Sequence, residues 1–205
     1  DGGSSAADHT LYDVAVVGGG PSGATAANDL AQRGYRVLLL DRAGRIKPCG
    51  GAIPPRLIAE FEIPDSLLVA RIASARMVSP TDKQVDMPID GGFVGMVDRD
   101  VFDEWLRARA ARSGAERRTG TFRQFRRGTD GIAVLDCEWR DDQGETHTTS
   151  FRARSVIGAD GAVSTVARQC IPGADQIRYV FAYHEIVRSP EQGAGSFDGS
   201  RCDVI

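Results

Sequence analysis

The fold is decided by residues 12–41, which read YDVAVVGGGPSGATAANDLAQRGYRVLLLD. They begin with an apolar, β-branched run at residues 12–17, which is typical of a short buried strand. A glycine-rich turn follows, and residues 24–33 then have the composition of a helix that stops before the next glycine. A second apolar run, residues 37–40, ends in Asp41. Strand, turn, helix and strand in this order predict a βαβ unit within a parallel sheet.

The glycine turn (residues 18–23) follows the pattern G-x-G-x-x-G at Gly18, Gly20 and Gly23. In that pattern the first glycine permits a tight turn, the second lets backbone approach a pyrophosphate, and the third lets helix and strand pack closely. The start of the helix, at Pro21 and Ser22, then turns its N–H groups toward the phosphates. By itself the pattern could be an ordinary glycine-rich loop, but the flanking strand and helix favour a dinucleotide site.

Asp41 follows Gly23 by 18 positions, at the end of the second strand. A carboxylate at this place in the dinucleotide pattern accepts hydrogen bonds from the ribose hydroxyls of adenosine. It also repels a 2′-phosphate, so the site favours FAD or NAD over NADP, although the neighbouring Arg42 leaves NADP open. The alternative role for Asp41 is that of a solvated strand end.

The composition is that of an ordinary soluble globular protein. The chain has 205 residues, of which 41% are hydrophobic and 26% charged, and its net charge of −3 excludes a general affinity for nucleic acid. No apolar run approaches the roughly 20 residues of a membrane-spanning helix. The four cysteines lie far apart without a Cys-x-x-Cys pair, which argues against a metal site and a disulfide framework and indicates a reduced, intracellular protein.

Beyond Asp41 the chain does not continue as a regular series of βαβ units. Residues 47–55 form a proline-broken, glycine-bearing loop that we expect to lie outside any sheet. An amphipathic helix is predicted over residues 99–112, because apolar side chains recur there at helical spacing. Short strands are predicted on either side of this helix, at residues 77–80, 84–89, 93–97, 121–127, 132–140, 146–153 and 155–158.

Residues 107–127 carry eight arginines and a single acid, Glu116. Such a run could bind an anionic membrane or the phosphates of NADPH. A solvated helix face and strand edge in an arginine-rich protein is the simpler interpretation.

Three features together resemble the FAD-dependent fold of aromatic hydroxylases and geranylgeranyl reductases. They are the glycine turn, the helix start Arg99-x-x-Phe102-Asp103-x-x-Leu106, and Gly158-Ala159-Asp160-Gly161 with Arg168 behind it. Three further segments look specifically like the geranylgeranyl reductases of chlorophyll and bacteriochlorophyll synthesis: KPCGGAIP (47–54), GMV (95–97) and VIGADG (156–161). This resemblance runs from about residue 12 to residue 205.

The resemblance implies an α/β fold in which a Rossmann-like FAD-binding domain carries an inserted β-meander and is followed by the start of an antiparallel substrate-domain sheet. Residues 178–188 and 201–205 would be the first strands of that sheet. Because the family continues for about as long again, we expect this chain to be the N-terminal part of a longer enzyme. The implied division is a flexible tail (1–10), an FAD-binding domain (11–75 and 96–170) and a partial substrate-binding domain (76–95 and 171–205).

The resemblance also assigns residues to the cofactor. The assigned cofactor-binding residues are Gly18, Gly20, Pro21, Ser22 and Gly23 at the pyrophosphate, Asp41 and Arg42 at the ribose, Arg99 near the phosphates or ribityl chain, Gly50 and Gly51 beside the flavin ring, and Asp160 and Gly161 at a second pyrophosphate contact. Two of these assignments have ordinary structural alternatives. Arg99 could be a surface residue, and Asp160 could simply form the turn at a strand end.

In the family, FAD takes hydride from NADPH and reduces isolated double bonds of a C20 prenyl chain, carried as a diphosphate or esterified to a pigment. Such a reduction needs hydride at one carbon and a proton at the other, so a thiol beside the flavin ring could donate that proton or orient the chain. Cys49 is therefore the candidate catalytic residue. The alternative is that Cys49 is a small, chemically silent residue in a tight loop.

A prenyl lipid or prenylated tetrapyrrole lies in a bilayer, so we expect a cytoplasmic protein in peripheral contact with a photosynthetic membrane. The oligomeric state is not indicated. Two other functions fit the same motifs. One is an FAD-dependent monooxygenase of the same fold, and the other is a non-catalytic FAD-binding module.

Overall fold

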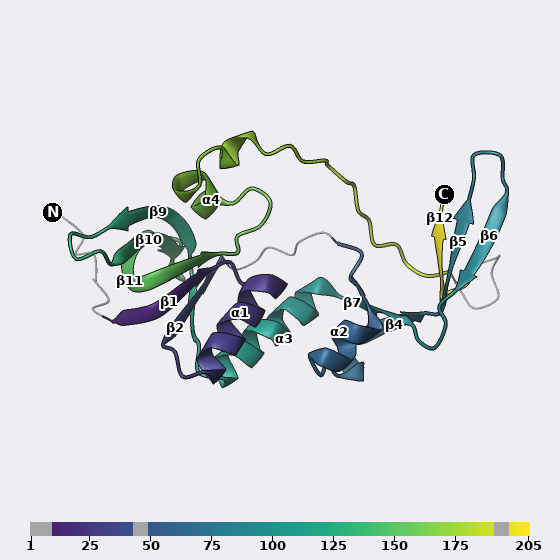
Figure 1. The fold of residues 1–205 in the computed structure, drawn as a ribbon, viewed down its shortest axis with the longest axis horizontal. Helices are drawn as coiled ribbons and strands as arrows, with labels where there is room; N and C mark the ends of the chain where they lie inside the picture. The colour runs from purple at the N-terminus through teal and green to yellow at the C-terminus, as the bar shows by residue number, and fades with distance from the viewer. Residues whose placement is uncertain (1–9, 43–48, 191–196) are drawn as a thin grey trace. The chain divides into compact units, whose positions relative to one another are not determined.

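The computed structural model describes residues 10–42, 49–190 and 197–205 (Figure 1). These residues divide into two compact units, the first within Asp1–Arg45 and Asp103–Phe181 and the second within Ile46–Phe102 and Ala182–Ile205. Almost all of the predicted tail, together with Lys47 and Pro48, lies outside the described residues. The division into FAD-binding and substrate-binding parts stays a prediction, and each unit is described here by itself.

The first unit is built on one six-stranded sheet with the strand order β8-β2-β1-β11-β10-β9. Strand β1 pairs in parallel with β2 and β11, and β2 pairs in parallel with β8, whereas β10 pairs antiparallel with both β9 and β11. The predicted α/β fold with a meander is therefore confirmed. The strands are β1 (Leu11–Val17), β2 (Val37–Asp41), β8 (Glu116–Thr119), β9 (Thr121–Arg127), β10 (Ala133–Arg140) and β11 (Thr146–Gly158).

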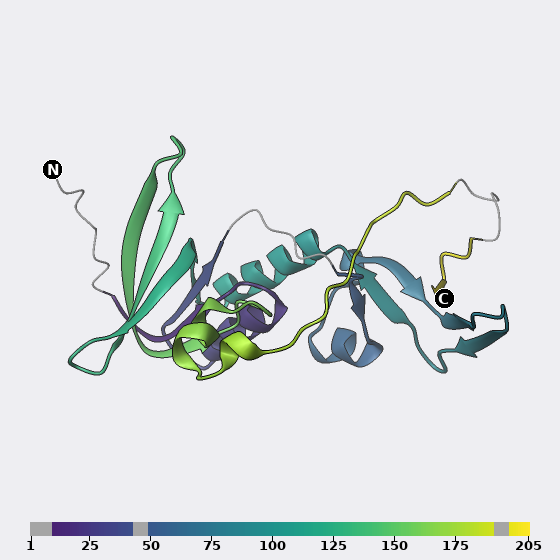
Figure 2. The same ribbon diagram turned by 90° about the horizontal axis from the view of Figure 1, so that it is seen from above.

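Strand β11 corrects the prediction of two separate strands at residues 146–153 and 155–158. It runs unbroken for 13 residues. Its first part pairs antiparallel with β10, and its last part, from Arg152 to Gly158, pairs in parallel with β1. The meander and the parallel sheet are thus one continuous sheet joined through β11 (Figure 2).

Three helices belong wholly or mainly to the first unit. They are α1 (Pro21–Gln32), α3 (Arg99–Arg112) and α4 (Thr165–Cys170). Helix α3 has the predicted bounds, whereas α1 begins three residues earlier than predicted because proline is well suited to the first helical position. Ser113, just after α3, donates a hydrogen bond to Asn28 of α1 at 2.9 Å, so the two helices lie side by side.

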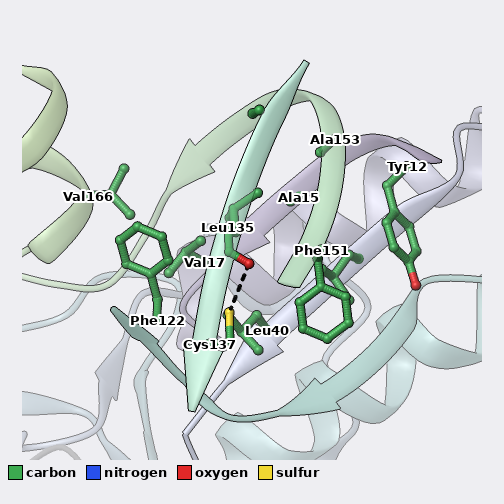
Figure 3. Close-up of a cluster of buried hydrophobic side chains, with 12 residues drawn as sticks. Tyr12, Ala15, Val17, Leu40, Phe122, Leu135, Cys137, Phe151, Ala153 and Val166 are labelled. Atoms are coloured by element: carbon green, nitrogen blue, oxygen red, sulfur yellow. Dashed lines mark hydrogen bonds between the residues drawn. The ribbon is translucent and has the colours of Figure 1, made fainter. Parts of the chain in front are cut away.

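Burial on both faces explains why strand β2 is continuously apolar up to Leu40. Residues 37–40 of β2 are all buried, and alternate residues of a strand point to opposite faces. Leu38 and Leu40 join a cluster with the meander and α4, centred on Leu135 and Cys137 of β10 (Figure 3). The buried members of this cluster are Tyr12, Ala15, Val17, Leu38, Leu40, Phe122, Ala133, Leu135, Cys137, Phe151, Ala153 and Val166.

The second unit contains two three-stranded sheets, β3-β7-β4 and β12-β5-β6, and the helix α2 (Pro55–Glu60). Strands β5 and β6 are antiparallel, and β12 joins β5 in parallel. The strands are β3 (Ala52–Ile53), β4 (Leu68–Ile72), β5 (Ser74–Val78), β6 (Gln84–Pro88), β7 (Val94–Val97) and β12 (Arg201–Val204). A single-turn 3-10 helix in this unit lies at Asp65–Leu67, and another, at Ala174–Gln176, belongs to the first unit.

Two expectations for the rest of the chain are wrong, and one predicted strand is displaced. Residues 47–55 do not all lie outside a sheet, since β3 pairs with β7 at Ala52 and Ile53. Residues 178–188 form no strand, because within the described residues no neighbouring strand offers them a ladder of hydrogen bonds. The strand predicted at residues 77–80 also lies slightly earlier, at β5.

Candidate cofactor site

The carboxyl ends of three parallel strands meet at one edge of the first unit's sheet. Val17 is level with Gly158 of β11 on one side and with Leu40 of β2 on the other. The N–H of Gly18 donates to the carbonyl of Leu40 at 2.8 Å, and the N–H of Ala159 donates to the carbonyl of Val17 at 2.7 Å. The glycine turn is thereby fastened at the edge where open α/β sheets bind their ligands.

Two glycines of the turn are required by the fold itself. Gly18 has a φ of +106°, and a Cβ there would lie 2.3 Å from the carbonyl oxygen of Ala159. A Cβ on Gly23 would lie 1.8 Å from the carbonyl oxygen of Gly18, so any side chain would push α1 away from the turn. These contacts confirm the steric reasons given for the first and third glycines of the pattern, the tight turn and the close packing of helix and strand.

Gly20 differs from both, because the protein itself does not require a glycine there. Its φ is −71°, and a Cβ would meet no atom within 4 Å. Gly20 is also the N-cap of α1, which has no side-chain hydrogen bond at its cap and no acidic residue in its first turn. The space before the helix is therefore open and faces backbone N–H groups, which is the environment a phosphate prefers.

Asp41 lies at the same edge of the sheet, next to Gly19 of the glycine turn. A Cβ on Gly19 would lie 2.7 Å from the Cβ of Asp41, so Gly19 makes room for the aspartate. Arg107 of α3 donates from Nη1 to Oδ2 of Asp41 at 3.2 Å and to the carbonyl oxygen of Gly19 at 3.1 Å. Arg42, next to Asp41, is exposed. The structure thus brings Asp41 to the glycine turn, as the dinucleotide pattern predicts.

Sequence reasoning placed Gly19 in the glycine turn but did not single out Arg107 as a site residue. Arg107 stands in the arginine-rich run that was interpreted as a solvated face, and most of that run fits the interpretation. Arg117, Arg118, Arg123 and Arg126 each pair with a carboxylate on the surface of the unit. Arg107 differs from these four arginines, since its side chain is only 19% exposed and reaches the glycine turn.

Asp160 has a structural role at the start of α4. Its carboxylate accepts hydrogen bonds from the Ser164 hydroxyl and from the N–H groups of Thr165 (2.6 Å) and Val166 (3.2 Å). These contacts agree with the alternative in which Asp160 forms the turn after the strand. Gly161 is exposed with a φ of +89°. A contact of either residue with a cofactor stays a prediction.

Pro21 and Ser22 begin α1, whereas Cys49, Gly50, Gly51 and Arg99 lie in the second unit. Cys49 and Gly50 are exposed, and Arg99, at the start of α3, is half-buried. Gly51 is required by packing, because its φ is +71° and a Cβ would lie 2.1 Å from the carbonyl oxygen of Val97. A flavin contact for Cys49, Gly50, Gly51 and Arg99 stays a prediction.

A separate group of possible metal ligands lies at the turn between β10 and β11. Asp141, Glu145 and His147 place one ligand atom each within 4.8 Å of one another. Hydrogen bonds within the turn account for this arrangement, because Asp141 accepts the N–H groups of Gln143 and Glu145 and contacts Nε2 of His147 at 2.6 Å. The group therefore carries no proposal of a metal site, and the expectation of no metal site stays a prediction.

A parallel sheet, a glycine turn at its carboxyl edge, an uncapped helix start and an acidic strand end define a Rossmann-like dinucleotide-binding domain. The family described as pyridine nucleotide-disulphide oxidoreductase matches residues 12–194. The chain belongs to this oxidoreductase family. None of its four cysteines, all within the described residues, is disulfide-bonded.

The chain is also homologous to geranylgeranyl reductases, as the sequence motifs indicated. It is 58% identical over 194 residues to the geranylgeranyl diphosphate reductase of Rhodobacter capsulatus, covering 94% of this chain and 48% of that protein. It is 38% identical over 192 residues to the chloroplastic geranylgeranyl diphosphate reductase of Oryza sativa subsp. japonica, covering 87% and 40%. The chain therefore spans about half the length, or less, of the curated relatives it matches.

A solved structure with the same fold is a geranylgeranyl bacteriochlorophyll reductase-like protein from Thermoplasma acidophilum. The TM-score is 0.63 at 28% identity, covering 74% of this chain and 39% of that one. Among the residues described, no helix has both the length and the apolar character needed to cross a membrane.

Proposed function

We propose that this chain binds FAD and is part of a reductase that hydrogenates double bonds of a geranylgeranyl chain, with NADPH as hydride donor. The observation that carries the proposal is the 58% identity to the Rhodobacter capsulatus geranylgeranyl diphosphate reductase over nearly the whole chain. The geometry of the glycine turn agrees with it, because no protein atom lies within 4 Å of the position that a Cβ on Gly20 would take, so a phosphate could approach the backbone there.

The residues present fit the ADP half of FAD. Backbone N–H groups at the start of α1 would hold the pyrophosphate, and the open space at Gly20 would let it come close to the chain. Asp41 would accept hydrogen bonds from the ribose hydroxyls. FAD, when bound, supplies the hydride-transfer chemistry. The chain's own contribution in the first unit is to bind and orient that cofactor.

Cys49 is proposed as the group that moves the proton. Its thiol is exposed on the loop before β3, in a segment that contains few bulky side chains. A thiol in contact with the alkene could donate a proton to one carbon while the other receives hydride, which completes the reduction of the bond. The substrate would be a prenyl lipid or a prenylated tetrapyrrole, reached by peripheral contact with a photosynthetic membrane.

Anaerobic turnover tests the proposed function. The purified protein would be incubated with FAD, NADPH and either geranylgeranyl diphosphate or a geranylgeranylated bacteriochlorophyll, and the prenyl products analysed by mass spectrometry. Loss of double bonds without oxygen is the expected result, and the better of the two substrates identifies the natural acceptor. Hydroxylated product formed only with oxygen would instead identify a monooxygenase. Bound FAD with no reaction of either kind would identify a non-catalytic module.

A further inference from the structure

The guanidinium of Arg107 links the glycine turn to Asp41, the two parts of the candidate site. Nη1 of Arg107 donates both to the carbonyl oxygen of Gly19, in the glycine turn, and to Oδ2 of Asp41, at the end of β2. The glycine turn would hold the pyrophosphate, and Asp41 would hold the ribose. Arg107 lies 66 residues from Asp41 in the chain, so this link exists only in the folded unit.

The guanidinium of Arg107 is also held by an acidic residue of its own helix. Nε of Arg107 donates to Oε2 of Glu104 at 3.1 Å, and Glu104 accepts two further hydrogen bonds from Arg117 of β8, at 2.8 and 2.9 Å. Hydrogen bonds from Arg117 and Arg107 hold the pKa of Glu104 below its ordinary value. Glu104 therefore stays ionised at neutral pH, and the charges alternate from Asp41 through Arg107 and Glu104 to Arg117.

We propose that Arg107 is a positioning residue of the cofactor site. It fixes the position of the Asp41 carboxylate relative to the glycine turn, so that the ribose and the pyrophosphate of one cofactor can be bound at the same time. This inference rests on the proposed FAD site. Asp41 keeps a second oxygen, Oδ1, whose lone pairs can accept a ribose hydroxyl while Oδ2 stays on Arg107.

The chemistry of the side chain explains why an arginine suits this position. Its planar group presents several N–H donors in a fixed arrangement, so it can bind Asp41, Gly19 and Glu104 at the same time. A lysine would carry the same charge but could not reproduce that geometry. A glutamine would lose the charge as well and leave Asp41 without its cationic partner.

The test measures FAD affinity in three variants of the purified protein. Arg107→Gln is expected to weaken FAD binding about tenfold, because one charge-assisted contact is lost at a partly buried position. Arg107→Lys should recover part of that loss. Arg126→Gln is the matched control, since Arg126 forms a comparable pair with Asp136 (2.7 and 2.8 Å) between β9 and β10, and its FAD affinity should equal that of wild type.

A double-mutant cycle with Asp41→Asn separates positioning from a general loss of stability. If Arg107 acts through Asp41, adding Arg107→Gln to Asp41→Asn should weaken binding much less than it does in the wild-type background. Additive losses would overturn the inference, as would wild-type FAD affinity in Arg107→Gln. Should Arg107→Gln fail to fold, Arg107→Lys with unchanged affinity and unchanged coupling to Asp41 would overturn it equally. Absence of FAD binding by the wild type would instead refute the proposed function, and this inference with it.

Discussion

Alanine substitutions at Gly20 and Gly23, the second and third glycines of the G-x-G-x-x-G pattern, should affect the stability of the fold very differently. At Gly20 an alanine methyl group would stand in open space, since no protein atom lies within 4 Å of that position and φ is −71°. The change replaces an N-cap glycine, so the free energy of unfolding should fall by no more than about 1 kcal/mol. At Gly23 the methyl carbon would lie 1.8 Å from the carbonyl oxygen of Gly18, which the fold cannot accommodate.

FAD binding should respond differently from stability. The methyl group of Gly20→Ala would occupy the space through which backbone N–H groups approach the pyrophosphate. Losing two such charge-assisted hydrogen bonds, each worth roughly 1.5–3 kcal/mol, should weaken FAD binding by about 3 kcal/mol or more, which is about a hundredfold or more.

The assay combines thermal unfolding of the FAD-free protein with an FAD titration followed by flavin fluorescence. Gly20→Ala should melt close to wild type but bind FAD poorly, whereas Gly23→Ala should lose its cooperative unfolding transition. Wild-type FAD affinity in Gly20→Ala would refute the reasoning, because it would mean that no phosphate lies against Gly20.

The other predictions concern the ribose, the core and the reacting group. Asp41→Asn should weaken ADP binding about tenfold. It should also reduce the preference for ADP over adenosine 2′,5′-bisphosphate, because Arg107 loses its anionic partner. An unchanged preference in a competition assay would contradict the assignment of Asp41 to the ribose. Burial raises the pKa of the Cys137 thiol from 9.0 to about 12. Between about pH 9 and pH 12 the thiol therefore stays neutral in the folded protein but ionises in the unfolded chain. The free energy of unfolding of wild type should fall over this range, and that of Cys137→Ala should not show this fall. Parallel stability profiles of the two proteins in denaturant titrations would be evidence against this burial. Cys49→Ser should slow anaerobic prenyl reduction at least about tenfold, with Cys202→Ser, another exposed cysteine, as the control; equal rates in both variants would remove Cys49 from the mechanism.

The parts of the fold that could be predicted are those with strong local signals. Strands β1 and β2 are apolar on both faces, and the glycine turn separates them from a helix whose end is marked by Gly34. Helix α3 could be placed to the residue, since its apolar positions recur at helical spacing. The glycine turn and Asp41 follow from the same local pattern, which is why the core of the candidate site was visible in the sequence.

The parts that could not be predicted depend on partners far away in the chain. Strand β8 reads ERRT and has no apolar signal, because it is an edge strand that pairs only with β2. Strand β3 is two residues long and exists only because β7 lies beside it. Arg107 looks like any arginine of a charged helix until folding brings it to Asp41. Residues 178–188 have the composition of a strand but no described strand to pair with.

The central claim, that the glycine turn and Asp41 hold FAD, is tested most directly by the flavin content of the protein. The protein would be purified, titrated with FAD, freed of excess cofactor and denatured, and the released flavin identified and quantified. We predict stoichiometric FAD, displaced by ADP in competition before denaturation. A protein that retains no flavin and shows no saturable binding of FAD would contradict the account.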